Sequence, residues 1–200
     1  MNDQDNKWVL ITGGAKRIGA EVAKTLHARG MNLAIHYNSS NQDAESLSHE
    51  LNVVRANSAM VFGANLTSDD ALEGLIPNVL SKTGRLDVLI NNASTFYPTP
   101  IDDITHDDWD NLIGTNLKAP MFLCKHAAQY LRKTKGSIIN MVDIHASKPL
   151  SNHPIYGPAK SGLAMLTRSL ARDLAPDVRV NGVAPGMILW PEKEPPENIK

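Results

Sequence analysis

Cysteine is nearly absent from the sequence: Cys124 is the only one among 200 residues, so no disulfide can form within the chain. A single thiol suits a reducing compartment, and we expect a cytoplasmic protein. Cys124 follows the apolar residues 121–123. We therefore interpret it as a small buried hydrophobic side chain and not as a nucleophile.

An excess of one charge is also lacking, because 20 Lys and Arg face 21 Asp and Glu and the net charge is −1. This balance gives no general electrostatic reason to bind nucleic acid or an anionic membrane. No apolar run is long enough to cross a bilayer, and residues 1–7 lack the apolar centre of a signal peptide. We expect neither nucleic acid nor a membrane as a partner.

What the chain does contain is a regular alternation of short apolar runs and longer amphipathic segments. The runs predict strands at residues 8–11, 32–36, 59–62, 86–90, 137–142 and 178–183. The segments predict helices over about 18–30, 41–53, 68–82, 107–131 and 161–174, the third of them capped by Ser68 or Asp69. This order predicts a single α/β domain over residues 1–200, with a Rossmann-type, doubly wound and mostly parallel sheet. Ligands of such a sheet bind beyond the carboxyl ends of its strands.

A glycine-rich turn joins the first strand to the first helix. Residues 12–19 read T-G-x-x-x-R-x-G and include Gly13, Arg17, Ile18 and Gly19. Glycines allow a tight turn and a close approach to a pyrophosphate, and a helix N-terminus supplies free N–H groups and a positive dipole end. At this place in the chain, the turn predicts a phosphate-binding loop.

The end of the second strand carries no carboxylate. Its residues are His36, Tyr37, Asn38, Ser39 and Ser40. An acidic residue there would bind the ribose 2′-hydroxyl of NAD and repel the 2′-phosphate of NADP. We interpret the run as a preference for NADP, with Arg17 or Lys16 adding charge. The alternative is a polar turn that ignores the 2′ position.

Tyr156 and Lys160 have the Y-x-x-x-K spacing, which places both side chains on one face of a helix. A neighbouring ammonium favours the phenolate and lowers a tyrosine pKa that is normally about 10. Tyr156 could then exchange a proton while hydride moves to or from a nicotinamide. Because proline is tolerated only in a first helical turn, Pro158 predicts that the regular helix begins close to Tyr156.

Together these motifs resemble the short-chain dehydrogenase/reductase family over nearly the whole chain. The pattern also includes Asn-Asn-Ala at residues 91–93, Asn116 within a helix, and residues 181–186 after the sixth strand. The resemblance implies NADP or NADPH as cofactor, no metal, and a role for Lys160 at the nicotinamide ribose. The implied cofactor-binding residues are Gly13, Arg17, Ile18, Gly19, His36, Tyr37, Asn38, Ser39, Ser40, Asn65, Leu66, Asn92, Ala93, Ser94, Asn116, Tyr156, Lys160, Pro185 and Gly186.

Asp143 departs from the pattern of most of this family. It stands thirteen positions before Tyr156, where most members carry a serine that positions a substrate carbonyl. A carboxylate is a poor partner for a carbonyl oxygen, but it accepts N–H groups and can serve a ring nitrogen. Asp143 therefore indicates a nitrogen heterocycle with a reducible C=N bond. The alternatives are a member that has lost activity and an aspartate that only caps the strand.

This variant pattern resembles the pteridine reductases within the family. The most specific stretch is residues 94–98, Ser-Thr-Phe-Tyr-Pro, after the fourth strand. The resemblance implies that Phe96 stacks on one face of a pterin. It assigns Asp143, Tyr156 and Lys160 to catalysis, and it implies a homo-tetramer. The implied substrate-binding residues are Arg17, Ser94, Phe96, Asp143 and Tyr156.

Two departures bear on the cofactor. The pteridine reductases carry an arginine beside the 2′-phosphate, and residues 38–40 contain none. Asn65 replaces the aspartate that usually binds adenine, although an amide can also bond an adenine edge. Cofactor binding is therefore predicted more firmly than the choice between NADP and NAD.

The sequence thus predicts an NADPH-dependent reductase that converts a dihydropterin to the tetrahydro form, with dihydrofolate as a further candidate substrate. One alternative is a short-chain reductase of a ketone or alcohol, and another is a non-catalytic NADP-binding module. Relatives continue after Pro185 and Gly186 through a substrate loop, a helix and a seventh strand. Here we expect a fold that stops after the sixth strand, with a loop at residues 190–200, in a fragment or an incomplete enzyme.

Overall fold

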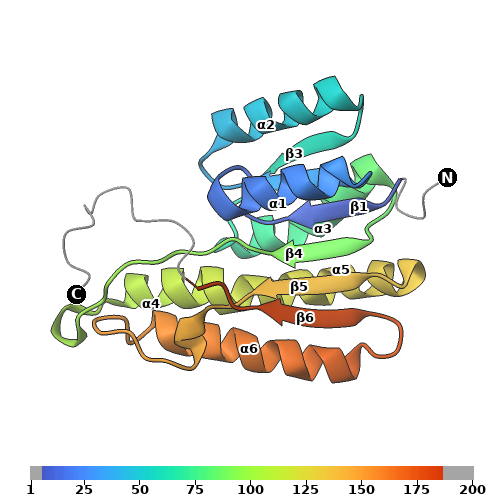
Figure 1. Ribbon diagram of the computed structural model, residues 1–200. Helices are drawn as coiled ribbons and strands as arrows, with labels where there is room; N and C mark the ends of the chain where they lie inside the picture. The colour runs from blue at the N-terminus through green and yellow to red at the C-terminus, as the bar shows by residue number, and fades with distance from the viewer. Residues whose placement is uncertain (1–5, 187–200) are drawn as a thin grey trace.

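The computed structural model describes residues 6–186, and its centre is one six-stranded parallel sheet (Figure 1). The strand order is β3-β2-β1-β4-β5-β6. The strands are β1 (Trp8–Ile11), β2 (Asn32–Tyr37), β3 (Ala59–Gly63), β4 (Val88–Asn91), β5 (Ser137–Met141) and β6 (Arg179–Val183). The chain first builds outward from β1 to β3, then returns and builds the other way from β4. The predicted Rossmann-type α/β fold is confirmed.

Helices cover both faces of the sheet. They are α1 (Arg17–Ala28), α2 (Asn41–Val54), α3 (Asp69–Thr83), α4 (His106–Ile113), α5 (Ala119–Thr134) and α6 (Tyr156–Asp173). One apolar core, named the α1–α2 core, lies between the sheet and helices α1 and α2. A second, named the α3–α5 core, packs the other face of the sheet against α3, α5 and the end of α6. Figure 1 shows the loops that follow the strands gathered at one end of the molecule.

Strand β1 shows why the two cores form. All four of its side chains are buried, as expected for a central parallel strand. Because successive side chains point to opposite faces, Trp8 and Leu10 join the α3–α5 core while Val9 and Ile11 join the α1–α2 core. The sequence therefore lacks polar alternation here and reads as one short apolar run.

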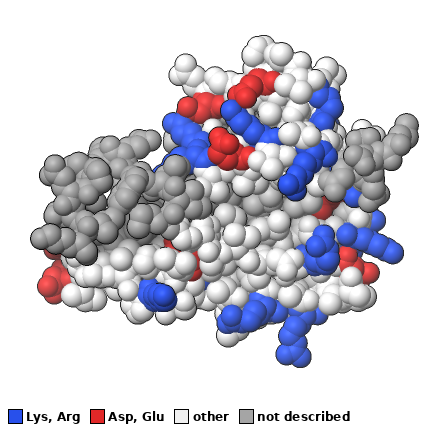
Figure 2. Space-filling model, viewed as in Figure 1, with Lys and Arg blue, Asp and Glu red and all other residues white. Residues whose placement is uncertain are grey.

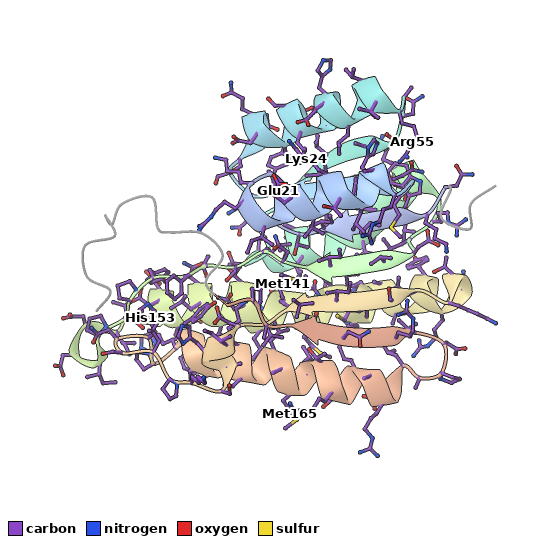
Figure 3. The ribbon with its side chains drawn as sticks, viewed as in Figure 1. Glu21, Lys24, Arg55, Met141, His153 and Met165 are labelled. Atoms are coloured by element: carbon purple, nitrogen blue, oxygen red, sulfur yellow. The ribbon has the colours of Figure 1, made fainter. Side chains whose placement is uncertain are left out.

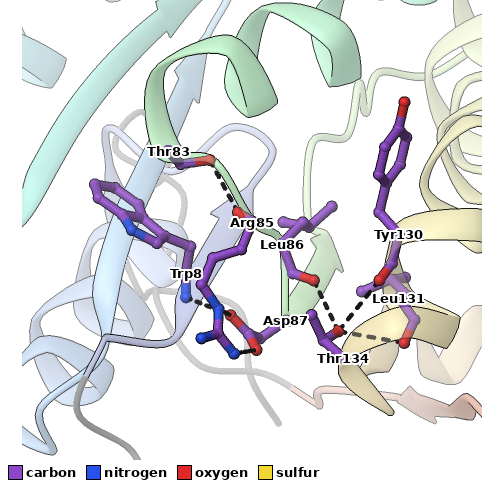
Figure 4. A network of polar contacts seen from close by, with 8 residues as sticks. All are labelled: Trp8, Thr83, Arg85, Leu86, Asp87, Tyr130, Leu131 and Thr134. Carbon is purple, nitrogen blue, oxygen red and sulfur yellow. Dashed lines mark hydrogen bonds and ion pairs between the residues drawn. The ribbon is translucent and has the colours of Figure 1, made fainter.

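The buried carboxylate of Asp87 ties the amino ends of β1 and β4 together. Asp87 Oδ2 accepts hydrogen bonds from the Trp8 backbone N–H at 2.8 Å and from Arg85 Nε at 2.9 Å. Arg85 Nη2 lies 2.6 Å from Oδ1, and the Thr134 hydroxyl of α5 donates to the Leu86 carbonyl at 2.9 Å (Figure 4). These bonds stabilise the end of the sheet opposite the loops.

The structure differs from the predicted helices in the bounds of two helices and in the cap of a third. The predicted helix over 107–131 is two helices, α4 and α5, joined by a π-helical turn at Gly114–Lys118. The last predicted helix begins at Tyr156, as Pro158 indicated, and not at residue 161. Ser68 precedes α3 in an extended conformation, but its side chain makes no capping hydrogen bond.

The surface of α1 and α2 carries both charges side by side (Figure 2). Lys16 Nζ lies 2.8 Å from the Asp43 carboxylate, and Lys24 Nζ lies 3.0 Å from that of Glu50. Among the described helices, none is long and apolar enough to cross a membrane. The predicted loop at residues 190–200 lies outside the described part of the chain.

Cys124 is buried in the α3–α5 core, as predicted. Burial raises the pKa of its thiol to about 12, so the thiolate is scarce at neutral pH.

Candidate active site

Two adjoining cavities lie at the carboxyl ends of the strands. The first, named the β2 cavity, has a volume of about 420 Å³ and reaches from the glycine loop to the end of β2 and to Asn65. The second, named the β5 cavity, has a volume of about 400 Å³ and contains the residues that follow β5 and begin α6. Both are lined by Gly13, Lys16, Ala93 and Ser94. They therefore meet at the glycine loop.

The structure brings the predicted site residues together around these two cavities. The β2 cavity is lined by Gly13, His36, Tyr37, Asn38, Ser39, Ser40, Asn65, Leu66, Ala93 and Ser94. The β5 cavity is lined by Gly13, Arg17, Ile18, Gly19, Asn92, Ala93, Ser94, Phe96, Asp143, Tyr156, Lys160, Pro185 and Gly186. Asn116 alone of the predicted residues lines neither cavity.

The glycine loop turns too tightly for other residues at two of its positions. Gly13 has φ +59°, and a Cβ on Gly19 would lie 2.4 Å from the Gly13 carbonyl oxygen. Arg17, the first residue of α1, also has a positive φ, +49°, which is unusual for a residue with a side chain. Its side chain is exposed at the mouth of the β5 cavity.

The His36 side chain, from the end of β2, holds the glycine loop by a hydrogen bond. The Gly13 N–H donates to His36 Nδ1 at 3.1 Å, so Nδ1 must be unprotonated, and Nε2 then donates to the Ala64 carbonyl at 2.9 Å. The side chain is 1% exposed, and burial lowers its pKa to about 4. His36 therefore fixes the backbone that lines the β2 cavity, in addition to lining it.

A second set of hydrogen bonds joins the glycine loop to the residues after β4. The Thr12 hydroxyl oxygen accepts from the backbone N–H groups of Asn92 and Ala93 at 2.9 and 3.0 Å. Asn92 Nδ2 donates to the Thr12 and Gly13 carbonyls at 2.9 and 3.0 Å. The walls shared by the two cavities are thus held as one unit.

Asn116 lines neither cavity but makes hydrogen bonds to the loop that lines them. It is fully buried in the π-helical turn, where Nδ2 donates to the Thr95 and Leu112 carbonyls, each at 2.9 Å. Its Oδ1 accepts the Ser94 hydroxyl at 2.6 Å. Asn116 thereby holds the loop that carries Ser94 and Phe96 against α4.

Asp143 and Tyr156, which both line the β5 cavity, are joined directly by a hydrogen bond. The Tyr156 hydroxyl donates to Asp143 Oδ2 at 2.7 Å, and Asp143 Oδ1 accepts the His145 N–H at 2.9 Å. Burial, together with the carboxylate that holds its proton, raises the pKa of Tyr156. Tyr156 is therefore a neutral phenol at physiological pH.

Lys160 lies close to Tyr156 but does not bond to it. Its Nζ donates to the Met141 carbonyl at 3.0 Å and lies 5.7 Å from the centre of the Tyr156 ring. The side chain is 2% exposed, and burial lowers its pKa to about 8 against the opposing effect of the Asp143 charge. The prediction that Lys160 makes the phenol acidic is wrong for this structure, because the carboxylate and not the ammonium contacts the hydroxyl.

Phe96 stands on the loop after β4 with 56% of its surface exposed. Its ring stacks on His153, with centroids 4.7 Å apart and an interplanar angle of 13°, and meets the Tyr156 ring edge-on at 4.8 Å. An exposed aromatic ring beside a phenol and a carboxylate can receive a flat polar ligand.

The predicted set of site residues misses several residues that line the cavities. Lys16 borders both cavities, whereas the sequence predicts for it only a contribution of charge; its place in the glycine loop is the signal that could have found it. The other missed residues are Ala15, Thr67, Thr95, Asn111, Thr115, Met141 and Val142. Ala15 and Thr95 lie within the glycine-loop and Ser-Thr-Phe-Tyr-Pro stretches, at positions to which the motifs give no role. The others belong to no motif, so only the fold reveals their position.

Comparison of the sequence with known proteins gives independent evidence on its family. The family model described as short chain dehydrogenase matches residues 7–195. Pteridine reductase 1 of Leishmania tarentolae is 37% identical over 227 residues, covering 93% of this chain and 78% of that protein. The 3-oxoacyl-[acyl-carrier-protein] reductase FabG of Staphylococcus aureus (strain Mu50) is 35% identical over 186 residues, covering 92% and 75%. The 3beta-hydroxysteroid dehydrogenase 1 of Eggerthella lenta is 30% identical over 193 residues, covering 95% and 74%.

Proposed function

The chain belongs to the short-chain dehydrogenase family of oxidoreductases, and from that premise we propose that it is an NADPH-dependent reductase of a pterin. The reaction would convert a dihydropterin to a tetrahydropterin, with dihydrofolate as a further candidate substrate. The observation that carries the proposal is the 2.7 Å hydrogen bond between Tyr156 and Asp143 in the β5 cavity. The similarity to a pteridine reductase over 93% of the chain supports it.

The two cavities fit a dinucleotide. They meet at the glycine loop, where Gly13 and Gly19 have no room for a Cβ, and a tight glycine turn of this kind can cradle a pyrophosphate. The β2 cavity would hold the adenosine half, with Asn65 and Leu66 beside the adenine ring. The β5 cavity would hold the nicotinamide half near Lys160. When bound, the reduced nicotinamide supplies the hydride.

The choice of NADPH over NADH rests on the residues at the end of β2. The β2 cavity has no carboxylate among its lining residues there, and Asn38, Ser39 and Ser40 present amide and hydroxyl groups. Lys16 adds a positive charge at the same cavity, although Asp43 pairs with it at 2.8 Å. A 2′-phosphate would meet donors and a cation there without meeting repulsion from the cavity wall.

The chain's own residues would handle the proton. Tyr156 keeps its proton at neutral pH and can give it to a ring nitrogen of the substrate when the neighbouring carbon receives hydride. The C=N double bond becomes C–H and N–H, and Tyr156 is left as a phenolate. The buried Lys160 ammonium would stabilise that phenolate, and Asp143 would accept N–H groups of the heterocycle.

The same carboxylate argues against a carbonyl substrate. A carboxylate beside the proton donor repels the lone pairs of a carbonyl oxygen, whereas it accepts the N–H groups of a pterin. Phe96 offers a flat surface at the same cavity. We therefore place a flat nitrogen heterocycle between the Phe96 ring and the nicotinamide position.

A second candidate is the reduction of a 3-oxoacyl thioester. It is favoured by the 35% identity to 3-oxoacyl-[acyl-carrier-protein] reductases over 92% of the chain, which is close to the value for the pteridine reductase. Asp143 is the residue that separates the two candidates.

The deciding experiment follows NADPH oxidation with dihydrobiopterin and with a panel of ketones that includes a 3-oxoacyl thioester. We expect turnover of the pterin only, and Asp143→Ser should reduce it strongly. Turnover of ketones alone would refute the pterin proposal. Tyr156→Phe should lower kcat/KM by about 10²- to 10⁴-fold while NADPH still binds. A wild-type protein that binds NADPH without any turnover would instead be a binding module.

We also propose that the enzyme works as a homo-tetramer in the cytoplasm on small-molecule substrates, by its likeness to the family. Light scattering coupled to size exclusion measures the assembly directly, and a monomer with full activity would refute the tetramer.

A further inference from the structure

His153 lies on the loop before α6 and contacts the exposed ring of the site. Its ring stacks on Phe96 with centroids 4.7 Å apart and planes within 13° of parallel. Nδ1 lies 2.6 Å from the Ser151 carbonyl oxygen, which can only accept, so Nδ1 donates and the ring is fixed within its loop. Figure 3 shows His153 at the end of the molecule where the loops gather.

The other nitrogen of His153 indicates that the residue is not there for stability. Nε2 is buried and has no hydrogen-bond partner among residues 6–186. A buried acceptor without a partner costs stability, and a phenylalanine could stack on Phe96 without that cost. A residue that costs stability at a site is expected to have a functional reason.

His153 and Phe96 face different hollows. Phe96 lines the β5 cavity, whereas His153 lines a separate groove of about 800 Å³ together with Pro149, Leu150 and Pro154. His153 therefore covers one face of Phe96 and borders this groove, while the Phe96 ring also borders the β5 cavity together with Asp143 and Tyr156.

Tyr156 contacts the same ring at a steep angle. The Phe96 and Tyr156 rings meet at 75° with centroids 4.8 Å apart. Two aromatic neighbours thus restrict an otherwise exposed side chain. Without His153, Phe96 would keep only the ring contact with Tyr156.

We propose that His153 is a positioning residue, which backs Phe96 so that one ring face is presented to a flat substrate in the β5 cavity. The claim that this face receives a pterin rests on the proposed function, whereas the claim that His153 fixes Phe96 does not. Aromatic pairs contribute about 0.5–1.5 kcal/mol beyond burial, which corresponds to about 2- to 13-fold in an equilibrium constant.

The test compares His153→Leu, which removes the stacking ring, with His153→Tyr, which keeps one. Phe96 is one of only three phenylalanines, so its ring can be assigned by selective labelling and by Phe96→Leu. The first readout is the nuclear Overhauser effect between the Phe96 and Tyr156 rings. We expect it to persist in wild type and His153→Tyr and to weaken in His153→Leu. An unchanged effect in a folded His153→Leu protein would overturn the proposal, whatever the substrate is.

The second readout is kinetic. For pterin reduction, KM should rise about 2- to 13-fold in His153→Leu by more than kcat changes, and His153→Tyr should restore it. Equal KM values in the two variants would also overturn the proposal. If the wild type reduces no pterin, the proposed function fails, and the Phe96–Tyr156 contact still decides the role of His153.

Discussion

At Tyr156 the decisive neighbour is the carboxylate of Asp143. It holds the phenolic proton at 2.7 Å, while the Lys160 ammonium is anchored on the Met141 carbonyl. The phenol is thus held in its neutral form, which the proposed reduction requires of its proton donor. In that proposal Lys160 acts after the proton has left, when it stabilises the buried phenolate.

This division of roles predicts a pH dependence. Because burial lowers the pKa of Lys160 to about 8, the ammonium is present at pH 7 and is lost as the pH rises through 8. We expect kcat/KM for reduction to be level below pH 7 and to fall about tenfold per pH unit above 8. Tyr156 has a raised pKa and keeps its proton over this range.

The measurement is a profile of kcat/KM between pH 6 and 10. Lys118→Met is a suitable control, because Lys118 forms an exposed pair with Asp69 away from the cavities. It should leave the profile unchanged. A wild-type profile that stays level beyond pH 9 would contradict the assignment to Lys160.

The residues of the site were predictable from sequence to different degrees. Tyr156 and Lys160 follow from their spacing, because residues four apart share a helix face. Asp143 follows from the resemblance to the family, whose members mostly carry a serine thirteen positions before the tyrosine. The direction of the Tyr156 pKa does not follow, because it depends on which of two charged groups contacts the hydroxyl. His153 lies in an irregular loop without periodicity, so only the structure reveals its contact with Phe96.

At the scale of elements, the glycine loop is held between β2 and β4. His36 supports Gly13 from the β2 side, and Asn92 bonds the Thr12 and Gly13 carbonyls from the β4 side. The bond to Gly13 requires Nδ1 of His36 to be unprotonated. Acid therefore disrupts this support.

The hydrogen bond between His36 and Gly13 predicts that the folded protein loses stability in acid. Burial lowers the pKa of His36 to about 4 from 6.5, so the unfolded chain binds a proton between these values that the folded chain does not. The free energy of unfolding should fall by about 3 kcal/mol as the pH drops from 6.5 to 4 on account of this residue. Above pH 6.5 its contribution is fully present.

Denaturant unfolding at a series of pH values measures this effect. His36→Asn keeps an acceptor near Gly13 but does not titrate, so its acid slope should be shallower than that of the wild type. His49→Asn, at an exposed position of α2, should keep the wild-type slope. Equal slopes in wild type and His36→Asn would contradict the prediction.

The elements themselves were largely predictable, since β1, β2 and β4 are short, largely buried runs that are followed directly by a polar residue. The exception is the segment 107–131, whose apolar spacing predicts one helical stretch. Its π-helical turn depends on Asn116, which bonds backbone carbonyls inside the fold. Such a turn is set by tertiary contacts that a local pattern does not contain.

At the scale of the whole molecule, a dinucleotide would join both halves of the sheet. The β2 cavity belongs to the half with β1 to β3, and the β5 cavity reaches β5 and α6. A ligand that spans both cavities binds only the folded chain. Its binding energy is therefore added to the stability of the fold.

We expect NADPH at about 100 times its Kd to stabilise the protein by about 2.7 kcal/mol, which raises the Tm of a chain of this size by about 5–11 °C. NADH at the same concentration should raise the Tm less. Lys16→Ala should reduce the difference, because Lys16 lines both cavities. Differential scanning fluorimetry measures all three, and equal shifts for the two cofactors would contradict the preference for NADPH.

The central claim is that Tyr156 and Asp143 act as one proton-handling pair. The most direct measurement is kcat/KM for dihydropterin reduction in Tyr156→Phe, Asp143→Asn and the double variant, with the Kd of NADPH measured in each. We predict that each single change lowers kcat/KM by about 10²- to 10⁴-fold, that the double variant is no worse, and that NADPH binding is preserved. Losses that multiply in the double variant, or an Asp143→Asn enzyme with wild-type activity, would contradict the account.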